Sequence, residues 1–337
     1  MSIKVLKSGL LTTVQDFGRY GYQQQGVVVG GAMDKLALRI ANLLVGNSEN
    51  AAGLEITMQG PELLFEQDTV VALGGADLSA SINEMPVHLW RPTLVKAGSI
   101  LRFGRPIDGN YSYLAVAGGI HVPVVMGSRS TYLQAGIGGL QGRALQKGDS
   151  LSFEVAPETA QLLFSELLLH AKKEESFTQS SWWPEPELLP KYEPNPLLRA
   201  MPGLEFNWFA ENSRDYIWQQ KYKCTPQSNR MGYRLQGTTL ALEEERELLS
   251  TAVSFGTVQV PPQGEPIILM ADSQTTGGYP RIAQVITADL PKLAQVQPGG
   301  VIQLQEVTLE EAQQLYYQQE KSLLALQQAI LYKLNQV

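Results

Sequence analysis

The stretch that decides the fold runs from residue 54 to residue 73 and reads LEITMQGPELLFEQDTVVAL. It contains three short apolar runs, at residues 54–58, 63–65 and 70–73, separated by a Gly-Pro pair and by polar residues. Short apolar runs that are bounded by turn residues are typical of β-strands. The stretch therefore predicts three consecutive strands.

The same pattern extends along the chain in both directions. Further strands are expected from the apolar runs at residues 2–6, 113–116, 258–260 and 267–270. A glycine turn followed by a strand recurs at residues 97–103, 147–153 and 298–304, and residues 59–66 resemble residues 236–243. This faint internal repeat favours two related β-barrel lobes.

Few helices are expected in this mainly β fold. Residues 34–45 place apolar side chains on one helical face, and residues 158–170 form a second candidate. Thr308 and Glu311 fit a capping box that opens a helix running towards Asn335. We expect its apolar stripe to pack on its own lobe; the alternative is a docking surface for a partner helix.

A proline-rich segment divides the chain. Six prolines lie between residues 184 and 202, and closely spaced prolines fix φ and lack donor N–H groups. Such a segment is typical of an extended linker. The expected domains are an N-terminal lobe at 1–170, a linker at 171–202, a C-terminal lobe at 203–306 and a C-terminal helix at 307–337.

The composition excludes several classes of protein. With 44% hydrophobic residues and a net charge of −7 over 337 residues the chain is not disordered, and one cysteine cannot build a disulfide framework. Its 33 acidic against 26 basic residues argue against a nucleic-acid partner. No apolar run reaches the roughly 18 residues of a membrane span, and Thr12 and Thr13 interrupt the first apolar run. We expect a cytoplasmic protein without a membrane partner.

Familiar nucleotide and metal motifs are missing from the sequence. There is no P-loop, and the glycines at 136–142 leave no room for the helix that a dinucleotide site needs. The histidines at 88, 121 and 170 lie far apart, so we expect no metal site.

Polar residues instead gather in four glycine-rich segments of a chain that is only 18% charged. The segments are residues 14–19 with 30–34, residues 127–132 with 136–143, residues 228–234, and residues 272–281. Glycines let the backbone approach a ligand, and arginines recognise carboxylate or phosphate bidentately. One such segment is often a surface turn, but four predict an anion-binding cleft between the lobes.

The candidate site residues come from these segments. Asp16, Asp272 and Arg230 are the catalytic candidates, because a carboxylate beside glycine and arginine can orient the arginine, bind a cation or act as a general base. Asp272 can equally form an Asx turn, and Asp34 is well placed as a helix N-cap. The candidates for substrate or anion binding are Arg19, Ser128, Arg129, Ser130, Tyr132, Arg143, Asn229, Tyr233, Arg234, Gln274, Thr275, Thr276, Gly277, Gly278 and Tyr279.

These segments resemble the biotin-dependent carboxyltransferase, or allophanate hydrolase subunit 2, family. The matching motifs are VQDFGR at 14–19, GSRSTY at 127–132, GRAL at 142–145, SNRMGYR at 228–234 and QTTGGYP at 274–280. The resemblance covers residues 3–306, with its motifs in the expected order. It implies that both lobes are cyclophilin-like β-barrels.

The resemblance also implies a function. It implies a component of an ATP-dependent 5-oxoprolinase that opens 5-oxo-L-proline to L-glutamate, together with two partners, the sister cyclophilin-like B subunit and the A subunit of that enzyme. ATP, with Mg²⁺, would be bound in the complex and would activate the lactam by phosphorylating it. That step needs positive charge around the γ-phosphate and the carboxylate, and Arg129, Arg143, Arg230 and Arg234 suit it by residue type.

Two alternatives follow from the same resemblance. Fusion relatives use this fold as the carboxyltransferase component of a biotin-dependent urea carboxylase and allophanate hydrolase system. This chain has no Met-Lys-Met biotin-attachment motif, so we expect no biotin attached to it. The other alternative is a regulatory protein that binds and sequesters a kinase-inhibitor sister protein.

Overall fold

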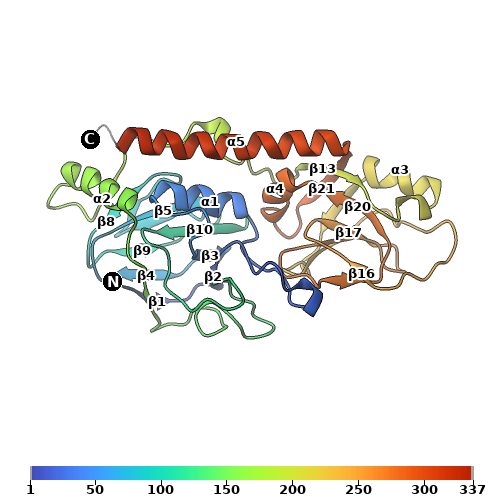
Figure 1. Ribbon diagram of the computed structural model, residues 1–337, viewed down its shortest axis with the longest axis horizontal. Coiled ribbons are helices and arrows are strands. Elements are labelled where there is room, and N and C mark those ends of the chain that lie inside the picture. The colour runs from blue at the N-terminus through green and yellow to red at the C-terminus, as the bar shows by residue number, and fades with distance from the viewer. Residues whose placement is uncertain (1, 335–337) are drawn as a thin grey trace. The chain divides into compact units, whose positions relative to one another are not determined.

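The computed structural model describes residues 2–334, and the chain divides into two compact units (Figure 1). Among the described residues, unit 1 contains 2–18, 34–190 and 321–334, and unit 2 contains 19–33 and 191–320. Each unit thus includes a short segment from a distant part of the chain. The expected mainly β fold, with few helices and a C-terminal helix, is confirmed.

Unit 1 is built from two six-stranded sheets, with strand orders β11-β1-β4-β9-β6-β7 and β12-β8-β5-β10-β3-β2. Its strands are β1 (Ser2–Lys7), β2 (Leu11–Gln15), β3 (Gly53–Thr57), β4 (Glu62–Phe65), β5 (Thr69–Gly75), β6 (Ser81–Ile82), β7 (Met85–Pro86), β8 (Thr93–Val95), β9 (Ile100–Arg102), β10 (Tyr111–Val116), β11 (Ser150–Ser152) and β12 (Phe177–Gln179). Alternating side chains such as Ile3, Leu54, Phe65 and Leu114 bring the two sheets together around one apolar core.

Helix α1 (Lys35–Leu44) covers the second sheet of unit 1 over β5 and β10 (Figure 1). It begins where the sequence predicts, because the Asp34 carboxylate accepts a hydrogen bond from the backbone N–H of Ala37 at 2.9 Å. Helix α2 (Glu158–His170) matches its predicted range. Its Leu163 and Leu167 join Ile40 and Leu44 of α1 in a second apolar cluster of unit 1, the α1–α2 cluster.

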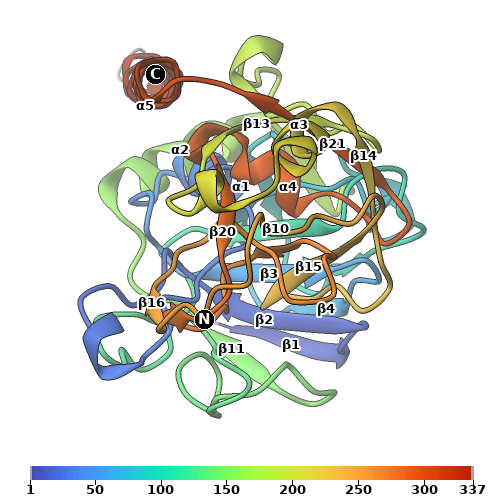
Figure 2. The same ribbon diagram turned by 90° about the vertical axis from the view of Figure 1, so that its right-hand side faces the viewer.

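Unit 2 contains a closed barrel with the order β13-β20-β17-β18-β15-β14-β21, and β16 pairs with β19 beside it (Figure 2). The strands are β13 (Leu197–Pro202), β14 (Lys221–Cys224), β15 (Gly232–Gln236), β16 (Thr251–Ala252), β17 (Thr257–Gln259), β18 (Ile267–Leu269), β19 (Thr276–Gly277), β20 (Arg281–Val285) and β21 (Val301–Glu306). Helices α3 (Glu211–Gln219) and α4 (Leu290–Ala294) also belong to this unit, and the sequence did not predict them.

The proline-rich segment is extended but also supplies strands. β12 pairs with β8 in unit 1, and β13 pairs with β20 and β21 in unit 2. Short 3-10 helices occur at Gln23–Gln25, Pro186–Leu188, Phe206–Trp208 and Thr287–Asp289.

The C-terminal helix α5 (Leu309–Leu334) opens with the predicted capping box. Thr308 Oγ1 accepts from the Glu311 N–H at 3.2 Å, and the Glu311 carboxylate accepts from the Thr308 N–H at 2.8 Å. The C-terminal half of its apolar stripe, Leu323, Leu326 and Ile330, is buried in the α1–α2 cluster of unit 1. The expectation that the helix packs on its own lobe, the C-terminal lobe that precedes it in sequence, is therefore wrong for this half. Asn335 lies outside the described residues.

All seven strands predicted from apolar runs are present, as β1, β3, β4, β5, β10, β17 and β18. Within residues 2–334, none of the helices is long and apolar enough to cross a membrane.

Candidate functional site

The carboxylate of Asp16 anchors the segment 127–130 in unit 1. Oδ1 accepts hydrogen bonds from Ser128 Oγ at 2.6 Å, Ser130 Oγ at 2.5 Å and the Gly18 N–H at 2.8 Å. Oδ2 accepts from the Arg129 N–H at 2.6 Å, and the Asp16 N–H donates back to Ser130 Oγ. Asp16 is 3% exposed. A buried carboxylate that accepts four hydrogen bonds positions a loop and is poorly placed to take a proton from a substrate.

The side chain of Arg129 leaves this anchored loop and is one-third exposed. Its Nη2 donates to Glu154 Oε1 at 2.5 Å, and His121 Nδ1 lies 3.3 Å from the same oxygen. The hydrogen bond with His121, followed by the contacts of Arg129, lowers the pKa of Glu154 despite partial burial. Arg129 is therefore an oriented cation with part of its surface open to solvent.

Arg143 is engaged within its own loop. Its Nη1 and Nη2 donate to Asp149 Oδ2 at 2.7 Å and to Oδ1 at 2.9 Å, and further bonds reach the Ala144 carbonyl and Gln141. The pair raises the pKa of Arg143 and lowers the pKa of Asp149.

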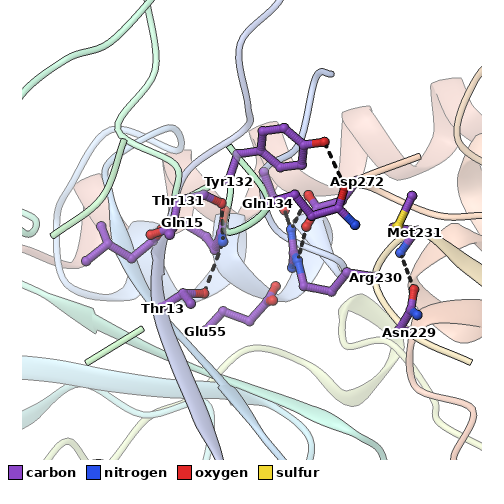
Figure 3. A network of polar contacts seen from close by, with 12 residues as sticks. Thr13, Gln15, Glu55, Thr131, Tyr132, Gln134, Asn229, Arg230, Met231 and Asp272 are labelled. Atoms are coloured by element: carbon purple, nitrogen blue, oxygen red, sulfur yellow. Dashed lines mark hydrogen bonds and ion pairs between the residues drawn. The ribbon is translucent and has the colours of Figure 1, made fainter. Parts of the chain in front are cut away.

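Tyr132 is half-buried, and its hydroxyl lies 3.2 Å from Gln134 Oε1 (Figure 3).

Unit 1 also contains buried polar residues that the sequence interpretation missed. The Tyr113 hydroxyl donates to Glu55 Oε2 at 2.8 Å and accepts from the Asp34 N–H at 2.8 Å. Gln15 Nε2 donates to Thr13 Oγ1 and to the Thr131 carbonyl (Figure 3). The signal that could have found them was a charged residue, Glu55, inside an otherwise apolar strand.

In unit 2, Arg230 and Asp272 form a buried bidentate ion pair (Figure 3). Arg230 Nε donates to Asp272 Oδ2 at 2.7 Å and Nη2 to Oδ1 at 2.9 Å, while Nη2 also donates to the Gly31 carbonyl at 2.6 Å. The Asp272 N–H in turn donates to the Arg230 carbonyl. The pair thus fastens segment 19–33 to the loops of unit 2.

Arg19 is fully buried in the same unit. Its backbone N–H donates to the Val29 carbonyl, and Gly30 has φ +64. A Cβ on Gly30 would lie 3.5 Å from Asp272 Oδ1 and 3.7 Å from Arg19 Nη1. Both distances are ordinary van der Waals contacts, so the positive φ, and not crowding, favours glycine at this position.

The segment 228–234 turns tightly beside this pair. The Asn229 side chain caps the turn by accepting from the Met231 N–H at 2.8 Å (Figure 3). Tyr233 is buried and donates to the Ala294 carbonyl at 2.8 Å, so its hydroxyl is used inside the unit. The side chain of Arg234 is exposed.

The segment 274–279 forms the last candidate loop. It is held by the β16–β19 pairing, by the Val253 N–H donating to the Thr275 carbonyl, and by Gln259 Nε2 donating to the Tyr279 carbonyl at 3.2 Å. A Cβ on Gly277 would come within 2.5 Å of Gln259 Nε2, so it would displace the end of the Gln259 side chain that holds this loop. Gln274, Thr276 and Tyr279 are exposed, whereas Thr275 and Gly278 are half-buried and Gly277 is buried.

The structure thus forms one group of candidates in each unit. Asp16, Ser128, Arg129 and Ser130 meet in unit 1, and Arg19, Arg230 and Asp272 meet in unit 2. Both candidate catalytic carboxylates have their oxygens engaged by donors. The cleft expected between the lobes stays a prediction. Within residues 2–334, the acidic, histidine and cysteine side chains form no group of three that could hold a metal ion.

The sequence and the structure are similar to known proteins along nearly the whole chain. Residues 25–306 match the family model described as "Carboxyltransferase domain, subdomain A and B". The chain is 44% identical to the C subunit of 5-oxoprolinase from Escherichia coli, over 94% of this chain and 97% of that protein. It is 42% identical to the C subunit of 5-oxoprolinase from Haemophilus influenzae, over 93% of this chain and 94% of that protein.

A solved structure with the same fold is the urea amidolyase of K. lactis, with a TM-score of 0.86 and 32% identity. The likeness covers 96% of this chain but only 20% of that much longer protein. The resemblance inferred from the glycine-rich motifs is thereby confirmed: the chain belongs to the carboxyltransferase domain family, in which its similarity to the 5-oxoprolinase C subunits extends over nearly the full length of both proteins.

Proposed function

We propose that the chain is one component of an ATP-dependent 5-oxoprolinase, active in a complex with the sister B subunit and the A subunit of that enzyme. The observation that carries the proposal is its 44% identity over 97% of a relative named as the C subunit of 5-oxoprolinase. The urea amidolyase, in contrast, is matched over only a fifth of its length. A chain that matches a subunit over 94% of its own length and 97% of that protein's length is best interpreted as the same kind of subunit.

The reaction opens a five-membered lactam, which is a stable amide. Phosphoryl transfer from ATP to the lactam oxygen would break the bond between the β- and γ-phosphates, release ADP and leave an activated carbon for water to attack. Hydrolysis then releases phosphate and glutamate. Both the transferring phosphoryl group and the substrate carboxylate are anionic, so the site must supply oriented cations.

The arginines differ in how well they can serve this need. Arg129 lies on a loop and Arg234 on strand β15, and both have solvent-accessible side chains, so we assign them to contacts with anionic groups of the substrates. Arg230 and Arg143 have bidentate carboxylate partners, which makes them positioning residues. Asp16 likewise positions the loop that carries Arg129.

A second candidate function is the carboxyltransferase component of a biotin-dependent urea carboxylase. The TM-score of 0.86 against the K. lactis urea amidolyase favours it. In that case, biotin attached to another protein would deliver the carboxyl group, and the same arginines would meet carboxybiotin.

The test is to co-express the chain with its sister proteins and to measure glutamate release from 5-oxoproline with ATP. The assay is repeated with Arg234→Ala and with the matched control Arg246→Ala, an exposed arginine outside the candidate loops. We expect Arg234→Ala to lower kcat/KM by about tenfold or more and the control to match the wild type. Turnover of urea with biotin carboxylase, without turnover of 5-oxoproline, would instead establish the second candidate.

A further inference from the structure

One face of the second sheet in unit 1 carries polar side chains although it is buried. Thr13 of β2 lies opposite Glu55 of β3, and Glu55 lies opposite Tyr113 of β10. Gln15 is on the same face, two residues beyond Thr13. All four are at most 2% exposed, so their hydrogen-bonding groups must be satisfied without bulk water.

The orientation of the Gln15 amide follows from its partners. Nε2 donates to Thr13 Oγ1 at 3.0 Å and to the Thr131 carbonyl at 3.1 Å. Because a carbonyl can only accept, the amide nitrogen must face Thr131, and the oxygen must face the other way. This oxygen, Oε1, is buried and has no hydrogen-bond partner among residues 2–334. A buried acceptor without a partner is costly, which points to a donor supplied by a ligand.

The neighbouring groups define the chemistry of that donor. The Tyr113 hydroxyl gives its proton to Glu55 and accepts from the Asp34 N–H, so it has no proton left for a ligand. Burial, and then the charges of Glu55 and Asp34, raises the pKa of Tyr113 well above its ordinary value, so the hydroxyl stays protonated. Carboxylates therefore flank the face, and an anionic ligand group would be repelled from it.

We propose that Gln15 Oε1 is a binding group for a neutral N–H donor, the N–H of an amide, lactam or urea. The inference rests on the proposed function and deepens it: the N–H side of the substrate would be read by Gln15, and its anionic groups by arginines. Figure 3 shows the Gln15 amide between Thr13 and the Thr131 carbonyl, which hold it in place. A preorganised acceptor of this kind discriminates strongly against an analogue that lacks the hydrogen.

The test compares 5-oxoproline with N-methyl-5-oxoproline as substrates of the assembled complex. We expect the wild type to favour the N–H lactam by about 100-fold or more in kcat/KM. Gln15→Met removes the acceptor at similar volume, so it should lose most of this preference. Gln15→Glu is assayed below neutral pH, where a buried carboxyl is protonated and so keeps one donor and one acceptor. This variant should retain the preference for the N–H lactam. Thr12→Val is the matched control, since it removes a buried hydroxyl from the opposite face of β2.

The outcomes separate this inference from the proposed function. Suppose that the wild type turns over 5-oxoproline while a folded Gln15→Met complex keeps the same preference for the N–H lactam. This result would overturn the role of Gln15 and leave the proposed function intact. If the wild type does not turn over 5-oxoproline, the proposed function fails, and calorimetric titration with 5-oxoproline and with urea decides the subsite. If Gln15→Met binds either probe more weakly than the wild type does, and Thr12→Val binds it with wild-type affinity, the subsite at Gln15 is supported. Binding that is equal in all variants, or an internal water as the only occupant of the acceptor, overturns it.

Discussion

The guanidinium of Arg230 holds the carboxylate of Asp272 by two parallel hydrogen bonds, from Nε to Oδ2 at 2.7 Å and from Nη2 to Oδ1 at 2.9 Å. Both side chains are nine-tenths buried. Such a pair fixes geometry more than it adds stability, since taking two charges out of water offsets much of their attraction. In this chain it aligns the turn at 228–234 with the segment that begins at Asp272.

Removal of Arg230 should destabilise unit 2. Arg230→Ala leaves the Asp272 carboxylate buried without a cation, and we expect a loss of about 3–5 kcal/mol in the free energy of unfolding. The double variant Arg230→Met with Asp272→Leu removes both charges and should recover most of that stability without recovering activity. Urea denaturation of the wild type, Arg230→Ala and the double variant measures their free energies of unfolding. If Arg230→Ala is as stable as the wild type but inactive, Arg230 contacts the substrate directly.

The carboxylate of Asp16 should act through the loop that it anchors. Asp16→Asn places an amide N–H₂ among hydrogen-bond donors. We therefore expect the free energy of unfolding to fall by about 1–3 kcal/mol and kcat/KM to fall as well. Ser128→Ala removes only one of the four donors to Asp16 and should have a smaller effect of the same kind. Thermal unfolding and steady-state kinetics are measured on both. Full stability together with abolished turnover in Asp16→Asn would show a direct catalytic role instead.

Two glycines in the 136–142 segment provide a matched pair of substitutions. Gly139 and Gly136 both have positive φ, +51 and +64, but a Cβ on Gly139 would collide with Thr131 Oγ1, whereas a Cβ on Gly136 would meet nothing. Each Gly→Ala change carries a backbone cost of about 1 kcal/mol. The collision should destabilise Gly139→Ala, but not Gly136→Ala, by a further amount of about 1–3 kcal/mol. Equal melting temperatures for the two variants would contradict the packing of Thr131 against Gly139.

The buried ion pairs of unit 2 predict sensitivity to acid. Burial raises the pKa of Asp289, but hydrogen bonds from Arg199 outweigh it, and the pKa lies below its ordinary value. Arg281 lowers the pKa of Glu205 against burial in the same way. A depressed pKa means that the unfolded state binds more protons, so this stability is complete above the ordinary carboxyl pKa of about 4. It is lost as the pH falls through the folded-state pKa values.

We therefore expect the free energy of unfolding to fall between about pH 5 and about pH 2, measured by urea denaturation at several pH values. Asp289→Asn should be less stable than the wild type at neutral pH and should show a shallower decline in acid. A flat profile for the wild type would contradict the assigned pKa directions.

The sequence predicts local structure well where short-range chemistry decides it. The Asp34 N-cap and the Thr308–Glu311 capping box need only a few neighbouring residues, and both occur as expected. Long-range pairing could not be read in this way. Glu154 and Gln259 hold candidate loops that lie 25 and 20 residues away in sequence, and nothing near them in sequence marks these roles.

The sequence places the candidate residues in glycine-rich segments, but their roles depend on partners that sequence does not give. Asp16 and Asp272 are candidates because each is a carboxylate in a segment with glycine and arginine. The structure shows the first surrounded by N–H and O–H donors and the second clamped by Arg230. Glycine-rich segments therefore identified where the loops are, and tertiary hydrogen bonds decide which side chains are open to a ligand.

The most direct test of the proposed function is a product balance on the reconstituted complex. Glutamate and inorganic phosphate are measured together from 5-oxoproline and ATP, with this chain present and with it omitted. We predict equal amounts of glutamate and phosphate when the chain is present, and loss of glutamate release when it is absent. Unchanged glutamate release without the chain, or phosphate release without any glutamate in the complete complex, would contradict a role for it in opening the lactam.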